Sequence, residues 1–493
     1  MLLSRTESTI EAIYTQSPPA FGVHALGAAF VEDTGRSLAG NARFVGHVAN
    51  RYLRIDSFVH FEGSAARRRA VNELLSLALP PALSISPETA RSIKDFVALV
   101  RDDLSQRPFP PGYVVSTRWR LILEGAVRSA AQLDDARHVA VQAMARVVFD
   151  MGMPILSAAQ ARELRESRSR YDAQHPELRA IGESALALPG TVADVGPGFS
   201  YNIEQSFGYY HDIVSGIGLE NISGVAIEVG SGFGRTPRIL HLLRRFRCIV
   251  LVDLPGSLTF AFAYLRVNFP DARFHMILSP ADVSEGLTER YDFIFCPVNY
   301  LESLRLGEVQ LVINTYSLGE MQQCCIDHIL RCISVNIKPR FFYSLNIIFE
   351  DKNLHYDASG GTGEGSEIVL DLAPEWWPRR FEMLPLLLDD GYRSHASVVL
   401  ERLEDTEPAA LVSRLRTAAA LAQKGSPEWL GPMYLAALWT PDVGIIDEFL
   451  DGLHSYIASQ RFDQFASYDF EKIGEVRFLQ RRRAALVSNS VPT

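Results

Sequence analysis

Cysteine is scarce in this sequence: the 493 residues include only five, an odd number, and none lies in a Cys-x-x-Cys pair. A disulfide framework and a zinc ribbon are therefore not expected, and a reducing cytoplasm is the compartment that fits best. The chain also lacks a His-Glu-x-x-His motif or any other regular metal-ligand spacing, so we predict no metal site. The cysteines are Cys248, Cys296, Cys324, Cys325 and Cys332.

Long apolar runs are missing as well. No stretch of about 18 apolar residues occurs, which argues against a transmembrane helix. Residues 1–19 carry acidic and polar side chains and no apolar h-region, so they do not resemble a secretory signal. We therefore expect a cytoplasmic protein without a membrane partner.

Positive charge is not in excess, because 48 Lys and Arg stand against 58 Asp and Glu, for a formal net charge of -10. Phosphate binding needs a basic surface, so nucleic acid is not expected as the main partner. Two arginine runs occur, at 67–69 and 481–483. We interpret both as solvated helix faces, with an anion or RNA patch as the alternative.

What is present is an ordinary globular composition, with 47% apolar and 22% charged residues. At roughly 100–200 residues per domain, the length allows two to four domains. Changes in the hydrophobic pattern along the sequence divide the chain into three parts. We expect a mostly helical substrate-lid or oligomerisation region over 1–195, an α/β domain over 196–403, and a helical region over 404–493.

The middle part alternates β-branched runs with helical runs, which indicates a parallel sheet wrapped by helices. We predict a Rossmann-like α/β core with a mainly parallel seven-strand sheet and an antiparallel hairpin near its end, around the turn 389–392. Apolar spacing predicts flanking helices at 70–79, 87–104, 116–133, 135–151, 409–422 and 447–458. The predicted strands are 225–229, 248–252, 293–295, 309–313, 341–345, 366–372, 381–388 and 396–403.

A glycine-rich loop follows the strand at 225–229 and precedes a helix. Glycines let the backbone turn tightly and let a ligand lie against it. A nicotinamide site prefers Gly-x-Gly-x-x-Gly, whereas here Arg235 follows the third glycine and an acid precedes the first by two residues. This Glu-x-Gly-x-Gly-x-Gly pattern is the S-adenosylmethionine (SAM) variant of the loop. Its members are Glu228, Gly230, Ser231, Gly232 and Gly234.

The elements around the loop strengthen this interpretation. Thr236 suits the N-cap of the following helix and Pro237 its first position. The strand 248–252 leads into Asp253, whose carboxylate can accept both hydroxyls of an adenosine ribose. Leu254 follows as a further cofactor contact, and Ser257 can cap the next helix.

Two places compete for the adenine. One is Asp282, in the turn after the run 274–278, and the other is Asn299, after the strand 293–295. Counting strands in the sequence does not separate them, and each could equally be a plain surface turn.

The sequence resembles the sugar O-methyltransferase family of bacterial polysaccharide and natural-product loci. The resemblance covers residues 227–346, about a quarter of the chain. It implies a class I SAM-dependent methyltransferase. The matching stretches are Glu-Val-Gly-Ser-Gly-Phe-Gly at 228–234, Val-Asp-Leu-Pro at 252–255 with Tyr-Leu at 264–265, Ile-Asn-Thr-Tyr-Ser-Leu-Gly-Glu-Met at 313–321 and Phe-Tyr-Ser-Leu-Asn at 342–346.

Acceptor-side residues follow from topology, because ligands of open α/β sheets bind beyond the carboxyl ends of the strands. Asn314, Ser317 and Glu320 come directly after the strand 309–313, and we place Asn314 beside the cofactor. Glu320 could also be an ordinary charge at a helix N-terminus. The candidates for the catalytic base are Glu320, His211 and His355.

Other polar and aromatic residues have ordinary explanations. His395 sits between strands, Trp376 and Trp377 suit core packing better than acceptor stacking, and 389–390 suits a turn better than a cation site. We therefore expect SAM-dependent O-methylation of a sugar or polyfunctional natural product by a chain that could form a homo-oligomer. The alternatives are N-methylation in specialised metabolism, and a non-catalytic SAM-binding protein with an assembly or regulatory role.

Overall fold

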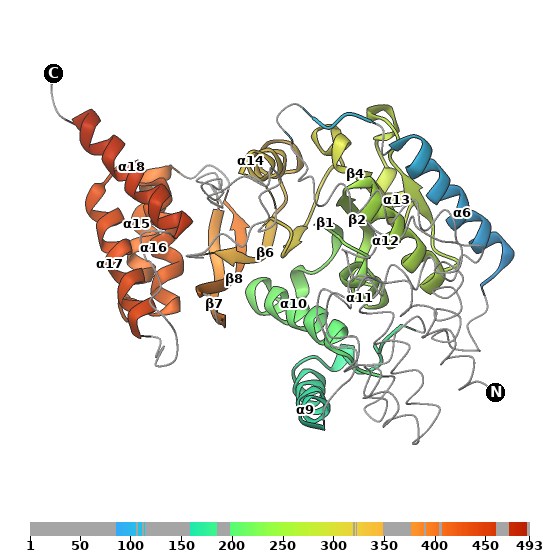
Figure 1. Ribbon diagram of the computed structural model, residues 1–493, viewed down its shortest axis with the longest axis horizontal. Helices are drawn as coiled ribbons and strands as arrows, with labels where there is room; N and C mark the ends of the chain where they lie inside the picture. Colours follow the sequence, from blue (N-terminus) through green and yellow to red (C-terminus); the bar gives the residue numbers. More distant parts are fainter. Residues whose placement is uncertain are drawn as a thin grey trace, which may run out of the picture.

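The computed structural model describes most of the central domain and parts of both flanking regions (Figure 1). The described residues are 85–104, 107–110, 113, 158–184, 198–318, 321, 323–348, 376–388, 391–403, 407–459 and 473–490. The helices expected at 70–79, 116–133 and 135–151 and the strand expected at 366–372 lie outside these ranges. Among the described helices, none is long and apolar enough to cross a bilayer.

A single eight-stranded sheet forms the centre, in the order β3-β4-β2-β1-β5-β6-β8-β7. The strands from β3 to β6 pair in parallel, and β8 pairs antiparallel with both β6 and β7. The bounds are β1 Gly224–Val229, β2 Phe246–Asp253, β3 Phe274–Met276, β4 Phe293–Pro297, β5 Leu311–Thr315, β6 Phe341–Ile348, β7 Trp376–Leu388 and β8 Gly391–Arg402.

The mainly parallel sheet and its antiparallel hairpin are confirmed, but the described residues alone form eight strands and not seven. One of these strands, β3, was not predicted. It is three residues long and pairs with the outer edge of β4. At the other edge, Leu388 pairs with Gly391, so β7 and β8 form the hairpin expected around 389–392.

Helices cover both faces of the sheet. Because successive strand residues point to opposite faces, Val225, Ile227 and Val229 of β1 belong to one apolar cluster and Ala226 to the other. The face that contains Ala226 is covered by α10 (Tyr201–Ile217), α11 (Arg235–Leu242) and α12 (Pro255–Asn268). The opposite face is covered by α14 (Gln323–Arg331) and the turns of η8 (Cys332–Ile337).

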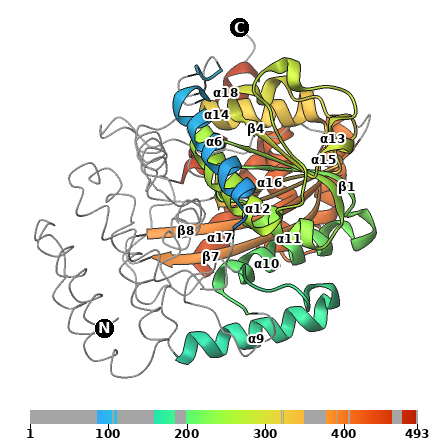
Figure 2. The ribbon, with the colours of Figure 1, turned by 90° about the vertical axis from the view of Figure 1, so that its right-hand side faces the viewer.

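The flanking regions pack onto this core. The C-terminal helices gather beside the β7 edge, where Gly431 lets the backbone of α16 approach the Phe381 ring closely (Figure 1). On the other side α6 runs along α12 (Figure 2), with the Phe96 and Phe262 rings stacked at 4.2 Å. The flanking helices are α6 Pro87–Asp102, α9 Ala158–Gln174, α15 Pro408–Ala419, α16 Pro427–Trp439, α17 Val443–Ser459 and α18 Gly474–Ser490.

Two expected helix caps are wrong. The helix after the glycine loop begins at Arg235 with Gly234 as its N-cap, and not at Thr236. Gly234 has a left-handed φ of 86° and ends the loop. The helix therefore has its N-cap two residues before Thr236, whose hydroxyl had suggested the cap. The next helix begins at Pro255 with Leu254 as its N-cap, because proline fits the first helical position, and Ser257 lies inside the helix.

Candidate functional site

The glycine loop lies at the point where the strand order reverses. From β1 the chain moves to β2 on one side, whereas β5 later pairs with β1 on the other side. In open α/β sheets such a switch point leaves a crevice outside the carboxyl ends of the strands, and ligands bind there. The reversal lies at the end of β1, next to Gly230.

The loop backbone adopts conformations that suit glycine. Gly230, Gly232 and Gly234 have φ values of 76°, 54° and 86°, in the left-handed region that side chains rarely occupy. A Cβ on Gly230 would lie 2.0 Å from the Ser317 hydroxyl, so that position needs glycine for packing. A Cβ on Gly232 would have no described heavy atom within 4 Å, so space is open above this part of the loop.

Asp253 is tied to the same loop. It is the last residue of β2, and its Oδ2 accepts the Gly232 backbone N–H at 2.8 Å. Its Oδ1 accepts the Leu254 N–H at 2.6 Å. These bonds hold the carboxylate beside the open space over Gly232, where a diol could hydrogen-bond to it.

Three polar atoms around the loop are buried and have no hydrogen-bond partner among the described residues: Glu228 Oε2, Ser231 Oγ and Arg235 Nε. Buried polar groups are normally paired, so such a cluster points to a missing polar ligand. Burial raises the pKa of Glu228 to about 8, although Thr236 and Arg235 act in the opposite direction. A cationic ligand group near Glu228 would restore its charged form.

Arg235, the residue after the loop, connects the glycine loop to α10. Arg235 donates to the Asn202 Oδ1 at 3.2 Å and to the Tyr209 hydroxyl at 3.3 Å. Its guanidinium carbon also lies 5.6 Å from the centre of the Tyr209 ring. The sequence drew attention to Arg235 only as a departure from the nicotinamide pattern, and its contacts with α10 are visible only in the structure.

The end of β5 is held by a buried amide network. Asn314 is fully buried and donates to the Val229 carbonyl at 2.8 Å and to the Ser317 hydroxyl at 2.5 Å. Its Oδ1 accepts from Asn346 at 2.8 Å. Because its polar atoms are occupied by protein, the Asn314 side chain supports the loop, and a direct side-chain contact with cofactor is not what this geometry favours.

The two adenine candidates now differ. β4 is the neighbour of β2, and Pro297 at the end of β4 pairs with Asp253 at the end of β2. Asn299 comes two residues after this pair. The Asp282 carboxylate instead accepts the N–H groups of Leu278 and Ser279 at 2.7 and 2.8 Å and closes its own turn. The geometry therefore favours Asn299.

Of the three candidate bases, only His211 lies in the described residues. His211 lies on α10, where its Nδ1 is 2.9 Å from the His175 Nε2, and burial lowers its pKa. It is two residues after Tyr209, and residues so spaced on a helix do not share a face. His211 therefore points away from the side of α10 that meets Arg235. Glu320 and His355 lie outside the described residues.

The remaining candidates behave as packing residues. Trp376 is fully buried in the core cluster, which confirms the packing interpretation. Trp377 lies under the Arg414 guanidinium at 4.7 Å. The described part of the chain contains no group of three or more His, Cys, Asp or Glu arranged to hold a metal ion.

One residue near the site was missed by the sequence analysis. Tyr113 is buried in the same apolar cluster as Val252, and the negative charge of Asp253 contributes to raising its pKa. Burial is the largest cause of that shift. In the sequence, Tyr113 directly follows the proline- and glycine-containing stretch 108–112, which by itself indicates only a break between helices.

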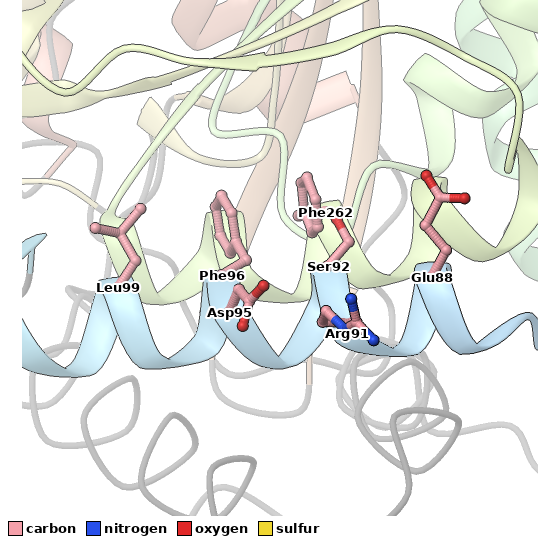
Figure 3. Close-up of a pocket in the computed structure, with 7 residues that line it drawn as sticks. All are labelled: Glu88, Arg91, Ser92, Asp95, Phe96, Leu99 and Phe262. Carbon is pink, nitrogen blue, oxygen red and sulfur yellow. The ribbon is translucent and has the colours of Figure 1, made fainter.

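A surface groove of about 410 Å³ lies between α6 and α12 (Figure 3). Neither the glycine loop nor Asp253 lines it, so we do not assign it to the cofactor site. Its lining residues are Glu88, Arg91, Ser92, Asp95, Phe96, Leu99 and Phe262.

No protein-family model and no curated protein sequence matches the chain. Among solved structures, M. capricolum TrmK with S-adenosyl-homocysteine is similar at 11% identity and a TM-score of 0.27, over 57% of this chain and 96% of that chain. Coclaurine N-methyltransferase is similar at 10% identity and 0.25, over 81% and 93%. Mitomycin 7-O-methyltransferase MmcR is similar at 15% and 0.24, over 69% and 98%. Scores this low do not assign an activity.

Proposed function

We propose that this chain is a SAM-dependent methyltransferase that methylates an oxygen of a small acceptor, a sugar or a polyfunctional natural product. The observation that supports this most directly is the Asp253 carboxylate, held by the Gly232 amide beside the open space over the loop. A carboxylate at this strand end suits a ribose diol, and the glycine loop suits a ligand that lies against backbone.

The residues present fit the parts of this cofactor. Asp253 suits the ribose, Asn299 and Leu254 suit the adenine, and the backbone of 230–234 suits the amino-acid chain. Glu228 and Arg235 add one acidic and one basic side chain next to the loop, each with a buried polar atom that lacks a described partner. These charges complement the ammonium and the carboxylate of the methionine moiety.

When bound, SAM supplies a methyl group on a sulfonium. Held at the glycine loop, it would offer this methyl group to a nucleophilic oxygen of the acceptor, and a side chain of the protein would have to take the acceptor proton. Alignment of the acceptor is the main contribution required of the protein. Glu320 and His355 remain the predicted bases, whereas the orientation of His211 does not favour it.

The test uses the full chain, calorimetry with SAM and a methyl-labelled SAM assay. The acceptor panel contains sugars and glycosylated natural products, each matched with an analogue in which an amine replaces the hydroxyl. We expect SAM binding and label on the hydroxyl acceptor. Label only on the amine would favour N-methylation, binding without any transfer would favour a non-catalytic SAM-binding protein, and absence of binding would reject the proposal.

A further inference from the structure

A short segment from the N-terminal region reaches the carboxyl ends of the strands. It follows α6, and we call its described residues, 107–110 and 113, the strap (Figure 1). Arg107 donates to the Leu278 carbonyl and to the Tyr300 hydroxyl, in the segments that follow β3 and β4. Asp103 holds the same guanidinium with an N–H···O bond of 2.8 Å. The strap is therefore anchored where β3 and β4 end, at the same carboxyl end of the sheet as Asp253.

The strap also fixes the orientation of Asn299. The Asn299 Nδ2 donates to the Pro108 carbonyl at 2.7 Å and lies 3.5 Å from the Arg107 carbonyl. Carbonyl oxygens accept and do not donate, so the amide nitrogen must face the strap. The Asn299 Oδ1 consequently faces away from it, is buried, and has no donor among the described residues.

The aromatic residues of the strap pack into the apolar core. Tyr113 is buried, and its ring stacks on Phe109 with centroids 5.7 Å apart. Phe109 and Leu254 both pack against the apolar cluster that contains Tyr113. Asn299 follows the end of β4, whose Pro297 pairs with Asp253. The strap that carries these rings and the unpaired Asn299 acceptor thus lie at the carboxyl ends of β3 and β4, next to the strand that ends in Asp253.

We propose that the strap is a wall of the nucleoside pocket and that it turns the Asn299 carbonyl oxygen toward the exocyclic amine of a bound adenine. This inference rests on the proposed function, because it concerns the nucleoside end of the same site. The buried acceptor matches a 6-amino purine, which donates there. A 6-oxo purine would place two acceptors face to face, so the strap makes the site selective between the two bases.

The first experiment uses the substitution Arg107→Met in the full chain, which releases the strap without changing Asn299. Calorimetry compares S-adenosyl-homocysteine with S-inosyl-homocysteine. We expect the wild type to prefer the adenine compound at least tenfold, about the effect of one lost hydrogen bond and one unpaired buried group. In the variant, affinity for the adenine compound should fall, and the preference should shrink below about threefold because the amide can then rotate.

Arg305 offers a matched control. It follows the turn that contains Asn299 and Tyr300, and it donates to the Glu302 and Leu304 carbonyls. It makes no described contact with the strap. Arg305→Met should keep the wild-type preference. If Arg107→Met also keeps it while both proteins bind S-adenosyl-homocysteine, the inference is wrong and the proposed function stands. If the wild type binds neither compound, the proposed function itself fails.

A second measurement does not depend on the folding of a variant. An 8-azidoadenosine analogue of S-adenosyl-homocysteine is photolysed on the wild-type protein, and mass spectrometry locates the adduct. The inference predicts labelling within residues 107–113 that excess S-adenosyl-homocysteine suppresses. Competed labelling only elsewhere, without an adduct in 107–113, would overturn it.

Discussion

At the scale of single residues, Asp253 is the group on which cofactor affinity should depend most. Asp253→Ala removes two hydrogen bonds between ribose hydroxyls and a charged group, each worth roughly 1.5–3 kcal/mol, so we expect SAM affinity to fall at least tenfold. Calorimetry on the purified proteins measures this. Asp271→Ala, an exposed position before β3, is the control and should bind as the wild type does. Equal affinity of the Asp253 variant would refute the ribose assignment.

Glu228 should make the stability of the ligand-free protein depend on pH. An unfolded glutamate loses its proton near pH 4.5, whereas the folded carboxyl keeps it to about pH 8. The folded state therefore binds more protons between these values, and stability falls as pH rises from about 4.5 to about 8. Glu228→Gln is neutral throughout, so its Tm relative to the wild type should rise by more than about 2 °C between pH 5 and pH 9.

Thermal unfolding followed by circular dichroism checks this expectation. Glu289→Gln, an exposed change in the short helix α13 (Leu287–Arg290), is the control and should follow the wild-type pH profile. A constant Tm difference between Glu228→Gln and the wild type across this range would show that the carboxyl is not held protonated by the fold.

The sequence revealed those site residues whose motif lies within one short stretch of the chain. The glycine loop and Asp253 were found because strand, loop, helix and strand follow one another within thirty residues. Asn314 was expected beside the cofactor, but its amide is occupied partly by Asn346, 32 positions away. Tyr113 was missed because it packs into the same core as Val252 from a segment about 140 residues earlier in the chain.

At the scale of elements, most of the described strands and the helices α6, α15 and α17 were predicted from periodicity. The helices α10 and α16 were not, and neither were the helix starts after Gly234 and Leu254. Thr236 and Ser257 have the right side chains for capping, but the backbone of Gly234 and the ring of Pro255 determine where each helix begins. The strand β3 was not counted because three residues give no clear alternation.

The attachment of α10 to the sheet gives a prediction at this scale. Asp212 accepts from the Tyr343 and Ser397 hydroxyls at 3.1 and 2.7 Å and pairs with Arg380 at 2.9 Å. Asp212→Asn removes the negative charge that accepts hydrogen bonds from donors on β6, β7 and β8. The free energy of unfolding should therefore fall by about 1.5–3 kcal/mol. Denaturant titration measures it. Ser397→Ala, which removes one neutral hydroxyl, should cost less, and an undiminished stability of Asp212→Asn would contradict the role of this network.

At the scale of the whole molecule, the described part of the N-terminal region meets the core in two places. α6 lies along α12 in the helical layer, and the strap contacts the segments that follow β3 and β4. The division into three parts, with 1–195 as a substrate-lid or oligomerisation region, remains a prediction. Amphipathic periodicity identified α6 correctly, but it does not specify which surface the apolar side of the helix meets.

The packing of α6 predicts that this helix and the sheet unfold together. Phe96 stacks on Phe262 of α12 and makes an edge contact with Phe295 of β4 at 6.1 Å. Phe96→Ala removes a buried ring and should lower the free energy of unfolding by about 3–5 kcal/mol. Hydrogen exchange should then be faster in β4 as well as in α6, because the amides of one cooperative unit share its opening free energy. Asp95→Ala, exposed on the same helix, should leave both unchanged. Faster exchange confined to α6 would instead show that this helix opens independently of the sheet.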